Sequence, residues 1–284
     1  MAKVRAVRIL LILTGLLVLS PASTKSQPLP DRVQTASPSE NDDGDTLKPA
    51  EPDFRLINLP TTLRLPLYRS NFQMTHRFNG NFHRGSFGEQ ASNLFGIDEG
   101  AVIGLEFRFA IARHVQAAFY RTSFDKTVQL HGKYDALSQG RSSPVAVSAL
   151  LSVEGGNNFK ERRIPALGAI VSRSVADTFA VYASPVWVHH SAAAAGFEAD
   201  TAFIGIGGRV RVRPTVYAVA EVSPRISGYR PGSAEFAFGI EKRAGGHMFQ
   251  LNVGNSQIST FGQLARGGFP QSLYLGFNLA RKFY

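Results

Sequence analysis

Charged side chains recur at every second position in several runs of the 284-residue chain. Arg209, Arg211 and Arg213 alternate with apolar residues, and alternate residues of an extended strand point to the same face. Opposite charges on such a face can neutralise one another across neighbouring strands, or they can form the charged ring that selects ions in a pore. Parity assigns ten side chains to one shared polar interior: Glu106, Arg108, Arg209, Arg211, Arg213, Glu221, Arg225, Glu235, Glu241 and Arg243.

Histidines are the other groups that could bind a metal ion or act as a general base, because the chain has seven of them and no cysteine. His189 and His190 stand in tandem at the end of a strand-like run, so we expect their rings to point to opposite faces rather than to share one ion. His76 and His247 share the apolar parity of their runs, as interfacial anchors would, with a metal or haem role as the alternative. We assign no metal and no cofactor, and the sequence leaves the roles of His76, His190 and His247 open.

Two serine and histidine pairs are the candidates for hydrolytic chemistry. Ser70 and His76 lie near one run, and Ser184 and His189 lie near another. Neither pair belongs to a recognisable nucleophile motif, and a catalytic pair is defined by geometry rather than by spacing. We therefore assign no catalytic residue and expect that the protein is not an enzyme.

Strand-like runs separated by Gly, Pro, Asn and Asp begin near residue 65. In one of them Ile103, Leu105 and Phe107 oppose Glu106 and Arg108, and the other runs alternate in a similar way. A soluble sandwich would also alternate, but with its apolar face inward. The twelve expected strands cover approximately residues 66–79, 98–111, 114–124, 127–135, 144–154, 163–173, 177–188, 201–213, 215–226, 233–243, 246–254 and 272–284.

The N-terminal part of the chain has the composition of an export signal followed by a spacer. Three basic residues precede an apolar run from Ile9 to Leu19 and a small-residue end, so we expect a cleaved signal peptide over residues 1–22 rather than a membrane anchor. Residues 23–63 are rich in Pro, Ser and acidic residues and are expected to form a disordered periplasmic leader, either a plain spacer or an interaction tail. Residues 64–284 then form one domain.

No later segment is long and apolar enough for a spanning helix, so a membrane location requires a closed barrel. The formal net charge of +10 falls to +7 without the three basic residues of the signal peptide, and with no dense basic block we expect no nucleic-acid partner. The long connections 80–97, 189–200 and 255–271 alternate with short ones, as outer loops and periplasmic turns do. The expected fold is all-β: an antiparallel, up-and-down transmembrane β-barrel of about twelve strands.

Seven stretches of the chain resemble an uncharacterised family of predicted bacterial outer-membrane β-barrels, from about residue 65 to the C-terminus. The resemblance implies a barrel in the outer membrane and brings no biochemical activity with it. The last stretch ends on the aromatic pair Phe283-Tyr284, the type of C-terminal strand that outer-membrane assembly machinery recognises. The stretches are THRF (75–78), NLFGID (93–98), KYDALSQG (133–140), SPVWVHHS (184–191), FIGIGGRVRV (203–212), GGHMFQLNVGNSQ (245–257) and LGFNLARKFY (275–284).

These observations predict a barrel of the bacterial outer membrane, exported by its signal peptide and surrounded by outer-membrane lipid. We expect a narrow passive channel for small solutes or ions with a lumen lined by Arg and Glu, because twelve strands enclose a space between a filled and an open interior. One alternative is a non-conducting binding or structural barrel that presents the loops 80–97 and 255–271, one of which could fold inward as a plug. A lipid-modifying barrel enzyme is the other alternative.

Overall fold

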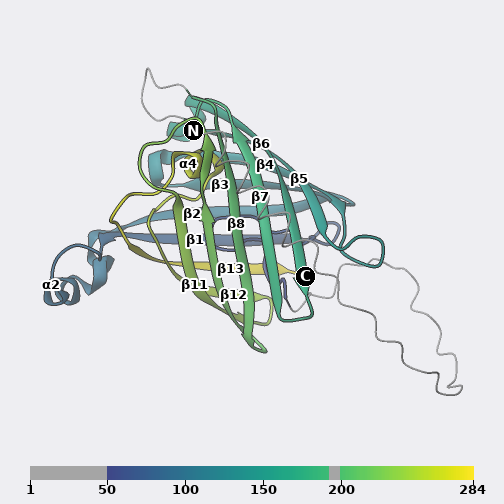
Figure 1. Ribbon diagram of the computed structural model, residues 1–284, viewed down its shortest axis with the longest axis horizontal. Coiled ribbons are helices and arrows are strands. Elements are labelled where there is room, and N and C mark those ends of the chain that lie inside the picture. The colour runs from purple at the N-terminus through teal and green to yellow at the C-terminus, as the bar shows by residue number, and fades with distance from the viewer. Residues whose placement is uncertain (1–49, 192–198) are drawn as a thin grey trace, which may run out of the picture. The chain divides into compact units, whose positions relative to one another are not determined.

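The computed structural model describes residues 50–191 and 199–284. The predicted signal peptide and residues 23–49 of the predicted leader lie outside the described residues. The described part is dominated by antiparallel strands (Figure 1). They are β1 (Ser70–Asn81), β2 (Ala101–Ala112), β3 (Val115–Thr122), β4 (Val128–Leu137), β5 (Ala146–Gly155), β6 (Glu161–Val175), β7 (Phe179–Val188), β8 (Thr201–Arg213), β9 (Val216–Ser223), β10 (Arg225–Ser227), β11 (Glu235–Ala244), β12 (His247–Gly254) and β13 (Tyr274–Phe283).

The strands close into a barrel of twelve long members. Each long strand pairs antiparallel with its neighbours in the sequence, and β13 pairs with β1 to join the two ends of the meander. The predicted all-β, antiparallel, up-and-down barrel is therefore confirmed. The expected run 215–226 is interrupted at Pro224, which has no N–H to donate to a ladder, so it divides into β9 and the three-residue β10.

The wall of the barrel is apolar outside, and its inner face carries charged and polar side chains together with an apolar cluster on β5, β6, β7 and β8. On β2 the outward residues Leu105 and Phe107 are 45 % and 49 % exposed, whereas Glu106 and Arg108 between them are buried. This arrangement is the reverse of a soluble β-barrel, and a continuous apolar exterior of this kind is the lipid-facing surface of a transmembrane barrel. The belt includes Ile103, Leu105, Phe107, Phe119, Leu130, Leu151, Leu167, Trp187, Val210, Val222, Phe238, Ile240, Phe249 and Leu251.

The connections at the two ends of the barrel differ in length. At one end, which we name the long-loop end, are the connections 82–100, 189–200, 224–234 and 255–273. The other end, named the turn end, has short connections such as 113–114 and 214–215. The exceptions are the short links 123–127 and 156–160 at the long-loop end and the longer 138–145 at the turn end.

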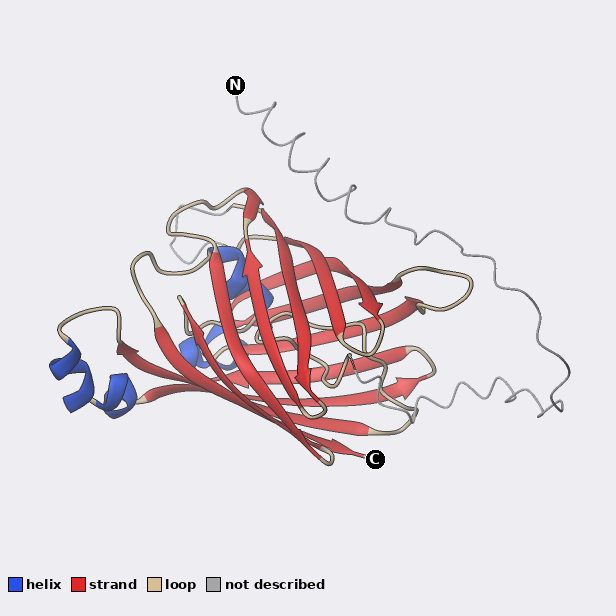
Figure 2. Ribbon diagram, turned by 60° about the horizontal axis from the view of Figure 1, so that its bottom comes forward, coloured by secondary structure: helices blue, strands red, loops and turns tan. Residues whose placement is uncertain are grey.

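The helices are short and belong to the long-loop end. Helix α2 (Phe87–Ser92) and the 3₁₀ helix η1 (Leu94–Glu99) project from the first long connection (Figure 2), and α4 (Phe261–Arg266) belongs to the last one. The other two are η2 (Phe124–Lys126) and α3 (Gly156–Phe159). No helix in the described part of the chain is long and apolar enough to cross a bilayer, a finding that concerns helices only.

Candidate functional site

The segment 50–65 lies inside the barrel, and we name it the inner hairpin. Phe54, Ile57 and Leu59 are fully buried, and the segment folds back on itself through the hydrogen bonds from Leu56 N to Leu59 O (2.8 Å) and from Thr61 N to Phe54 O (3.0 Å). The predicted disordered leader extended to residue 63, so its described part, 50–63, differs from that prediction. The apolar residues of 54–59 explain the difference, because they find an enclosed surface to pack on that a leader in solvent would lack.

Both legs of the inner hairpin enter from the turn end. Lys282, the third-last residue of the sequence, donates its Nζ to the carbonyl of Pro52 on the first leg. Lys133, near the turn end of β4, donates to the carbonyl of Leu63 on the second leg at 2.6 Å. The chain then leaves the barrel at the start of β1, so the tip of the hairpin, residues 56–59, points toward the middle of the barrel.

The tip of the inner hairpin is bound by one carboxylate. Glu221 of β9 accepts backbone hydrogen bonds from Ile57 (3.0 Å), Asn58 (2.7 Å) and Leu59 (3.1 Å). The side chain of Asn58 also donates to Glu235 of β11 at 2.9 Å. Hydrogen bonds to a charged acceptor are about twice as strong as neutral ones, so this carboxylate is the principal anchor of the tip.

Arg55 connects the inner hairpin to three other parts of the molecule. Its guanidinium forms a buried ion pair with Glu106 of β2 and donates to the carbonyl of Ser259, and its own carbonyl accepts from Arg209 Nη2 at 2.7 Å. The guanidinium also lies 5.1 Å from the centre of the Tyr120 ring. Burial acts to lower the pKa of Arg55, but the adjacent Glu106 carboxylate outweighs it and raises that pKa above its usual value, so Arg55 stays charged.

Two glycines of β8 leave room for the hairpin. Both face inward, and a Cβ at Gly205 would lie 2.5 Å from Leu59 Cδ2, while a Cβ at Gly207 would lie 2.5 Å from Leu56 Cδ1. These separations are too short for real carbon atoms, so a side chain at either position would displace the leucine. FIGIGGRVRV is one of the stretches that show the family resemblance, and two of its three glycines, Gly205 and Gly207, are explained by the close approach of the hairpin.

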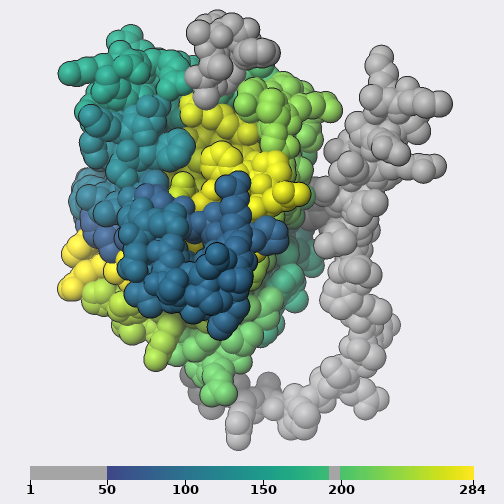
Figure 3. Space-filling model, turned by 90° about the vertical axis from the view of Figure 1, so that its left-hand side faces the viewer, coloured from purple at the N-terminus to yellow at the C-terminus, as the bar shows by residue number. Residues whose placement is uncertain are grey.

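The connection 255–273 fills the barrel from the opposite end, and we name it the inward loop. Ile258, Phe261 and Leu264 on it are at most 4 % exposed, and the N–H of Gly262 donates to Glu154 of β5 at 3.0 Å. Figure 3 looks at the long-loop end and shows yellow atoms of the C-terminal part of the chain filling the centre of that face. The loop meets the inner hairpin where Arg55 contacts Ser259, so the interior is occupied from both ends.

The structure divides the ten residues that parity assigned to the interior into two groups. Arg211, Arg213 and Arg243 lie at the turn end, while Arg225 lies at the long-loop end and donates to the carbonyl of Arg266 at 2.8 Å. The remaining six are at most 4 % exposed and lie inside the wall, namely Glu106, Arg108, Arg209, Glu221, Glu235 and Glu241.

The charge partners inside the wall differ from a simple neighbour-to-neighbour ladder. Arg209 pairs with Glu241, two strands away across β9, and the register places Glu221 opposite Gly207. Arg108 pairs with Glu106 on its own strand, with 2.7 Å between Nη2 and Oε1. Glu221 is therefore available to the inner hairpin because Arg209 is already bound to Glu241.

Parity also indicates interior residues that the assigned set did not include. Gln250 donates to the carbonyl of Leu56 at 2.7 Å, Asn278 donates to that of Ile57 at 3.0 Å, and Lys133 donates to that of Thr61 at 3.1 Å. The predicted lining contains charged residues only, which excludes Asn and Gln, and it contains no residue of β4. Their positions on alternate residues of β12 and β13 were the available signal.

The serine and histidine pairs are not brought together in the described residues. Ser70 and His76 are six residues apart on one strand, which is about 20 Å at the usual rise per residue. Ser184 is buried on the inner face, and no hydrogen bond joins it to His189, whose Nδ1 lies 2.8 Å from Oδ1 of Asp200. Neither pair has the contact that nucleophilic catalysis requires.

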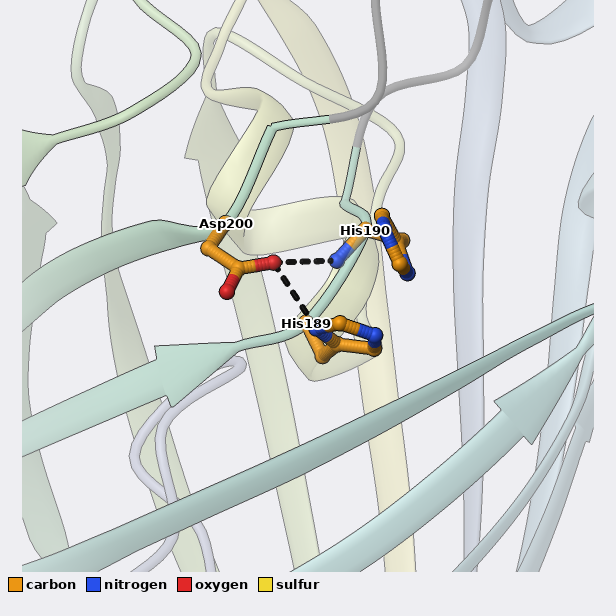
Figure 4. A group of neighbouring side chains, drawn as sticks. All are labelled: His189, His190 and Asp200. Atoms are coloured by element: carbon orange, nitrogen blue, oxygen red, sulfur yellow. Dashed lines mark hydrogen bonds and ion pairs between the residues drawn. The ribbon is translucent and has the colours of Figure 1, made fainter.

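The tandem histidines differ from the prediction. Their rings were expected to point to opposite faces, but the ring centres of His189 and His190 are only 3.6 Å apart (Figure 4). Alternation applies inside a strand, whereas β7 ends at Val188 and His190 has a φ of +48°.

His76 contacts the rings of Phe78 and Phe277 on the outer face, with centres 4.6 Å and 4.7 Å away.

The closed strands, the apolar belt and the polar, occupied interior define a membrane β-barrel protein. The model of a family described as "Membrane bound beta barrel domain (DUF5777)" matches residues 53–283, and the chain belongs to this family. The match confirms the resemblance found in the sequence. It also begins inside the inner hairpin, so the hairpin is part of the matched domain.

Solved structures of bacterial channels share the fold. The KdgM porin is 9 % identical with a TM-score of 0.50, over 76 % of this chain and 99 % of that one. The NanC porin is 8 % identical with a TM-score of 0.50, over 75 % and 99 %. An outer-membrane channel from Pseudomonas putida F1 is 13 % identical with a TM-score of 0.48, over 78 % and 97 %. No curated protein matches the chain. At 8–9 % identity, the likeness to the KdgM and NanC porins extends to the fold alone.

Proposed function

We propose that the protein is an outer-membrane channel for small solutes or ions, and that the conformation described is its closed state. Permeation rather than catalysis is its activity in this proposal. The observation that carries it is that the barrel encloses enough space for a sixteen-residue hairpin, 50–65, and a six-residue helix, α4, neither of which belongs to the wall. A twelve-stranded wall does not fill its own interior, so removal of these inserts leaves a pore.

The polar contacts of the inner hairpin are of a kind that water can replace, whereas Leu56, Ile57 and Leu59 also pack in an apolar cluster inside the barrel. Glu221, Gln250 and Asn278 bind the hairpin backbone, and all three remain soluble groups when the hairpin leaves. A buried polar group that loses its partner costs roughly 1–3 kcal/mol in a dry interior, but a flooded lumen removes that cost. The polar wall therefore supports both a closed and an open state.

The number of contacts indicates that the closed state dominates at rest. Each hydrogen bond contributes about 0.5–1.5 kcal/mol net, and the hairpin makes more than ten with the wall and the inward loop. A factor of ten in population corresponds to about 1.4 kcal/mol, so spontaneous opening of the intact chain is rare. We infer that opening requires a solute or a partner that competes for these contacts.

Deletion variants in planar bilayers test the proposal. The chain 23–284 is compared with one that lacks 23–65, one that lacks 257–268, and one that lacks both. A chain that lacks only 23–49 keeps the inner hairpin and is the matched control. Heat-modifiable migration on gels first confirms that each barrel is folded.

We expect conductance to be low for the intact chain and the control, and largest for the double deletion, because the two inserts block the lumen from opposite ends. A folded double-deletion barrel that does not conduct would overturn the proposal. That result would favour the second candidate function, a permanently filled binding or structural barrel. The many contacts of the inner hairpin are the observation in favour of that second candidate.

The proposed partners follow from the surfaces of the molecule. The apolar belt faces outer-membrane lipid, and the lumen takes small solutes or ions. Phe283 at the end of β13 is exposed on the outer face, where assembly machinery of the outer membrane would recognise the C-terminal strand. Tyr284 instead packs on the cluster of Phe54, Leu63 and Leu65, so the last residue contacts the inner hairpin.

A further inference from the structure

A cluster of two histidines and an aspartate lies at the long-loop end, outside the contacts of the inner hairpin and inward loop. His189 and His190 follow β7, and Asp200 precedes β8 (Figure 4). Each offers one ligand atom, and these atoms all lie within 4.8 Å of one another. Nδ1 of His189 is 2.8 Å from Oδ1 of Asp200, which also accepts the backbone N–H of His190 at 3.1 Å.

We propose that His189, His190 and Asp200 bind a divalent transition-metal ion. Imidazole nitrogens with one carboxylate are a donor set that suits Zn²⁺, Cu²⁺ and Ni²⁺, and in this series Cu²⁺ binds most tightly. Metal–ligand bonds of about 2.0–2.2 Å place tetrahedral ligand atoms about 3.3 Å apart, within the spread of separations found here. Three protein ligands leave a fourth position for water.

The surroundings hold the three ligands in place. Asp200 is fixed by the two contacts from the tandem histidines. Ser191, which follows His190, donates its hydroxyl to Thr201 of β8 at 2.6 Å. The His189 side chain is 37 % exposed and that of Asp200 is 45 % exposed, so an ion can reach the cluster from solvent. A bound ion would join the end of β7 to the start of β8.

The site also adjoins the inward loop. Arg266, at the end of α4, donates its Nε to the carbonyl of Ser191 at 2.9 Å. Metal binding at His190 therefore acts one residue away from a contact that holds the inward loop. The site therefore lies beside the inward loop, one of the two inserts that block the lumen in the proposed closed state. Metal binding itself does not depend on whether the barrel conducts.

The chain supplies its own reporter for the ion. Trp187 is the single tryptophan, and its ring centre lies 5.7 Å from that of His189. Cu²⁺ quenches tryptophan fluorescence at short range, whereas Zn²⁺ has a filled d shell and competes without quenching. The experiment titrates Cu²⁺ into the untagged, folded chain 23–284 in detergent, and then reverses the quenching with Zn²⁺.

We expect saturable quenching that weakens at least about tenfold in His190→Ala and in Asp200→Asn, since the loss of even an outer-shell partner of a metal costs about 10–100-fold in affinity. His83→Ala, which removes an exposed histidine of the connection 82–100, is the matched control and should behave as the unaltered chain does. Unsaturable quenching, or equal quenching in the His189→Ala/His190→Ala double variant, would overturn the assignment.

Discussion

The backbone N–H of Asn58 donates to Oε1 of Glu221 at 2.7 Å and joins two residues that are 163 positions apart in the chain. Asn58 belongs to a segment that has the composition of a flexible leader, and Glu221 belongs to the wall of the barrel. Their contact, repeated at Ile57 and Leu59, converts the N-terminal segment into part of the interior. In the proposed channel, the open or closed state of the lumen depends on how firmly the wall, and Glu221 in particular, holds the hairpin.

Replacement of Glu221 by Ala should loosen the inner hairpin. Three backbone N–H groups lose a charged acceptor, and each such hydrogen bond is worth about 1.5–3 kcal/mol, although the three do not add independently. Hydrogen exchange measured by mass spectrometry should show faster exchange over residues 50–65. The control is Glu161→Gln, an exposed acid of the long-loop end. Unchanged protection in Glu221→Ala would show that the other contacts suffice.

Replacement of Gly205 by Val should displace the hairpin by steric pressure alone. The new Cβ would meet Leu59 at 2.5 Å, and overpacking of an interior typically costs about 1–3 kcal/mol. We expect faster exchange at 56–59 with an intact, heat-modifiable barrel. Gly132→Ala on β4 is the control, because its nearest neighbour would be Gln116 O at 3.9 Å, an ordinary contact. Equal protection in both variants would contradict the tight packing of Leu59 on β8.

A disulfide should lock the hairpin to the wall. The hydroxyl oxygens of Thr62 and Ser172 are 2.5 Å apart, so Thr62→Cys and Ser172→Cys place two sulfurs within bonding reach. The chain has no cysteine of its own, so no other disulfide can form within it. In a Glu221→Ala chain that also lacks 257–268, we expect oxidation to suppress the conductance and reduction to restore it. Equal conductance of the oxidised and the reduced protein would mean that the current does not depend on movement of the hairpin.

The wall was predictable from the sequence, whereas its contents were not. The alternation over Ile103–Phe109 depends only on one strand and on the different surroundings of its two faces. It therefore predicts both the strand and the face that contacts lipid. The hairpin depends on distant partners such as Asn58 and Glu221, which leave no local pattern. Pro and acidic residues around 28–52 give that segment the composition of a flexible leader, whereas the apolar residues Phe54, Leu56 and Leu59 that follow are buried in the barrel.

The same reason explains the histidines. The prediction that His189 and His190 point to opposite faces assumes that both belong to a strand. In the structure, β7 ends at Val188, one residue before His189. Asp200 is ten residues beyond His190 and approaches it only because β7 and β8 pair. A metal site that spans a loop has no sequence spacing to detect, and strand ends are the least predictable part of a strand.

The opened barrel should prefer cations. Among the wall residues that are buried in the closed state, the acidic ones are Glu106, Asp135, Glu154, Glu221, Glu235 and Glu241, and the basic ones are Arg77, Arg108, Lys133, Arg209 and Lys282. The acidic set is larger by one, and Glu221 and Glu235 form no ion pair in the described part of the chain, whereas Lys133 keeps Asp135 and Arg209 keeps Glu241 when the segment leaves. Uncompensated carboxylates in a constriction attract cations.

Reversal potentials of the double-deletion barrel under a salt gradient measure this preference. Glu221→Gln with Glu235→Gln should move the reversal potential toward zero, because the local excess of negative charge is removed. Arg211→Glu should have a smaller effect, since the Arg211 guanidinium donates to Pro214 O and Asp177 O at the turn end rather than in the middle of the barrel. If Arg211→Glu has the larger effect, the constriction that selects ions lies at the turn end and not beside Glu221.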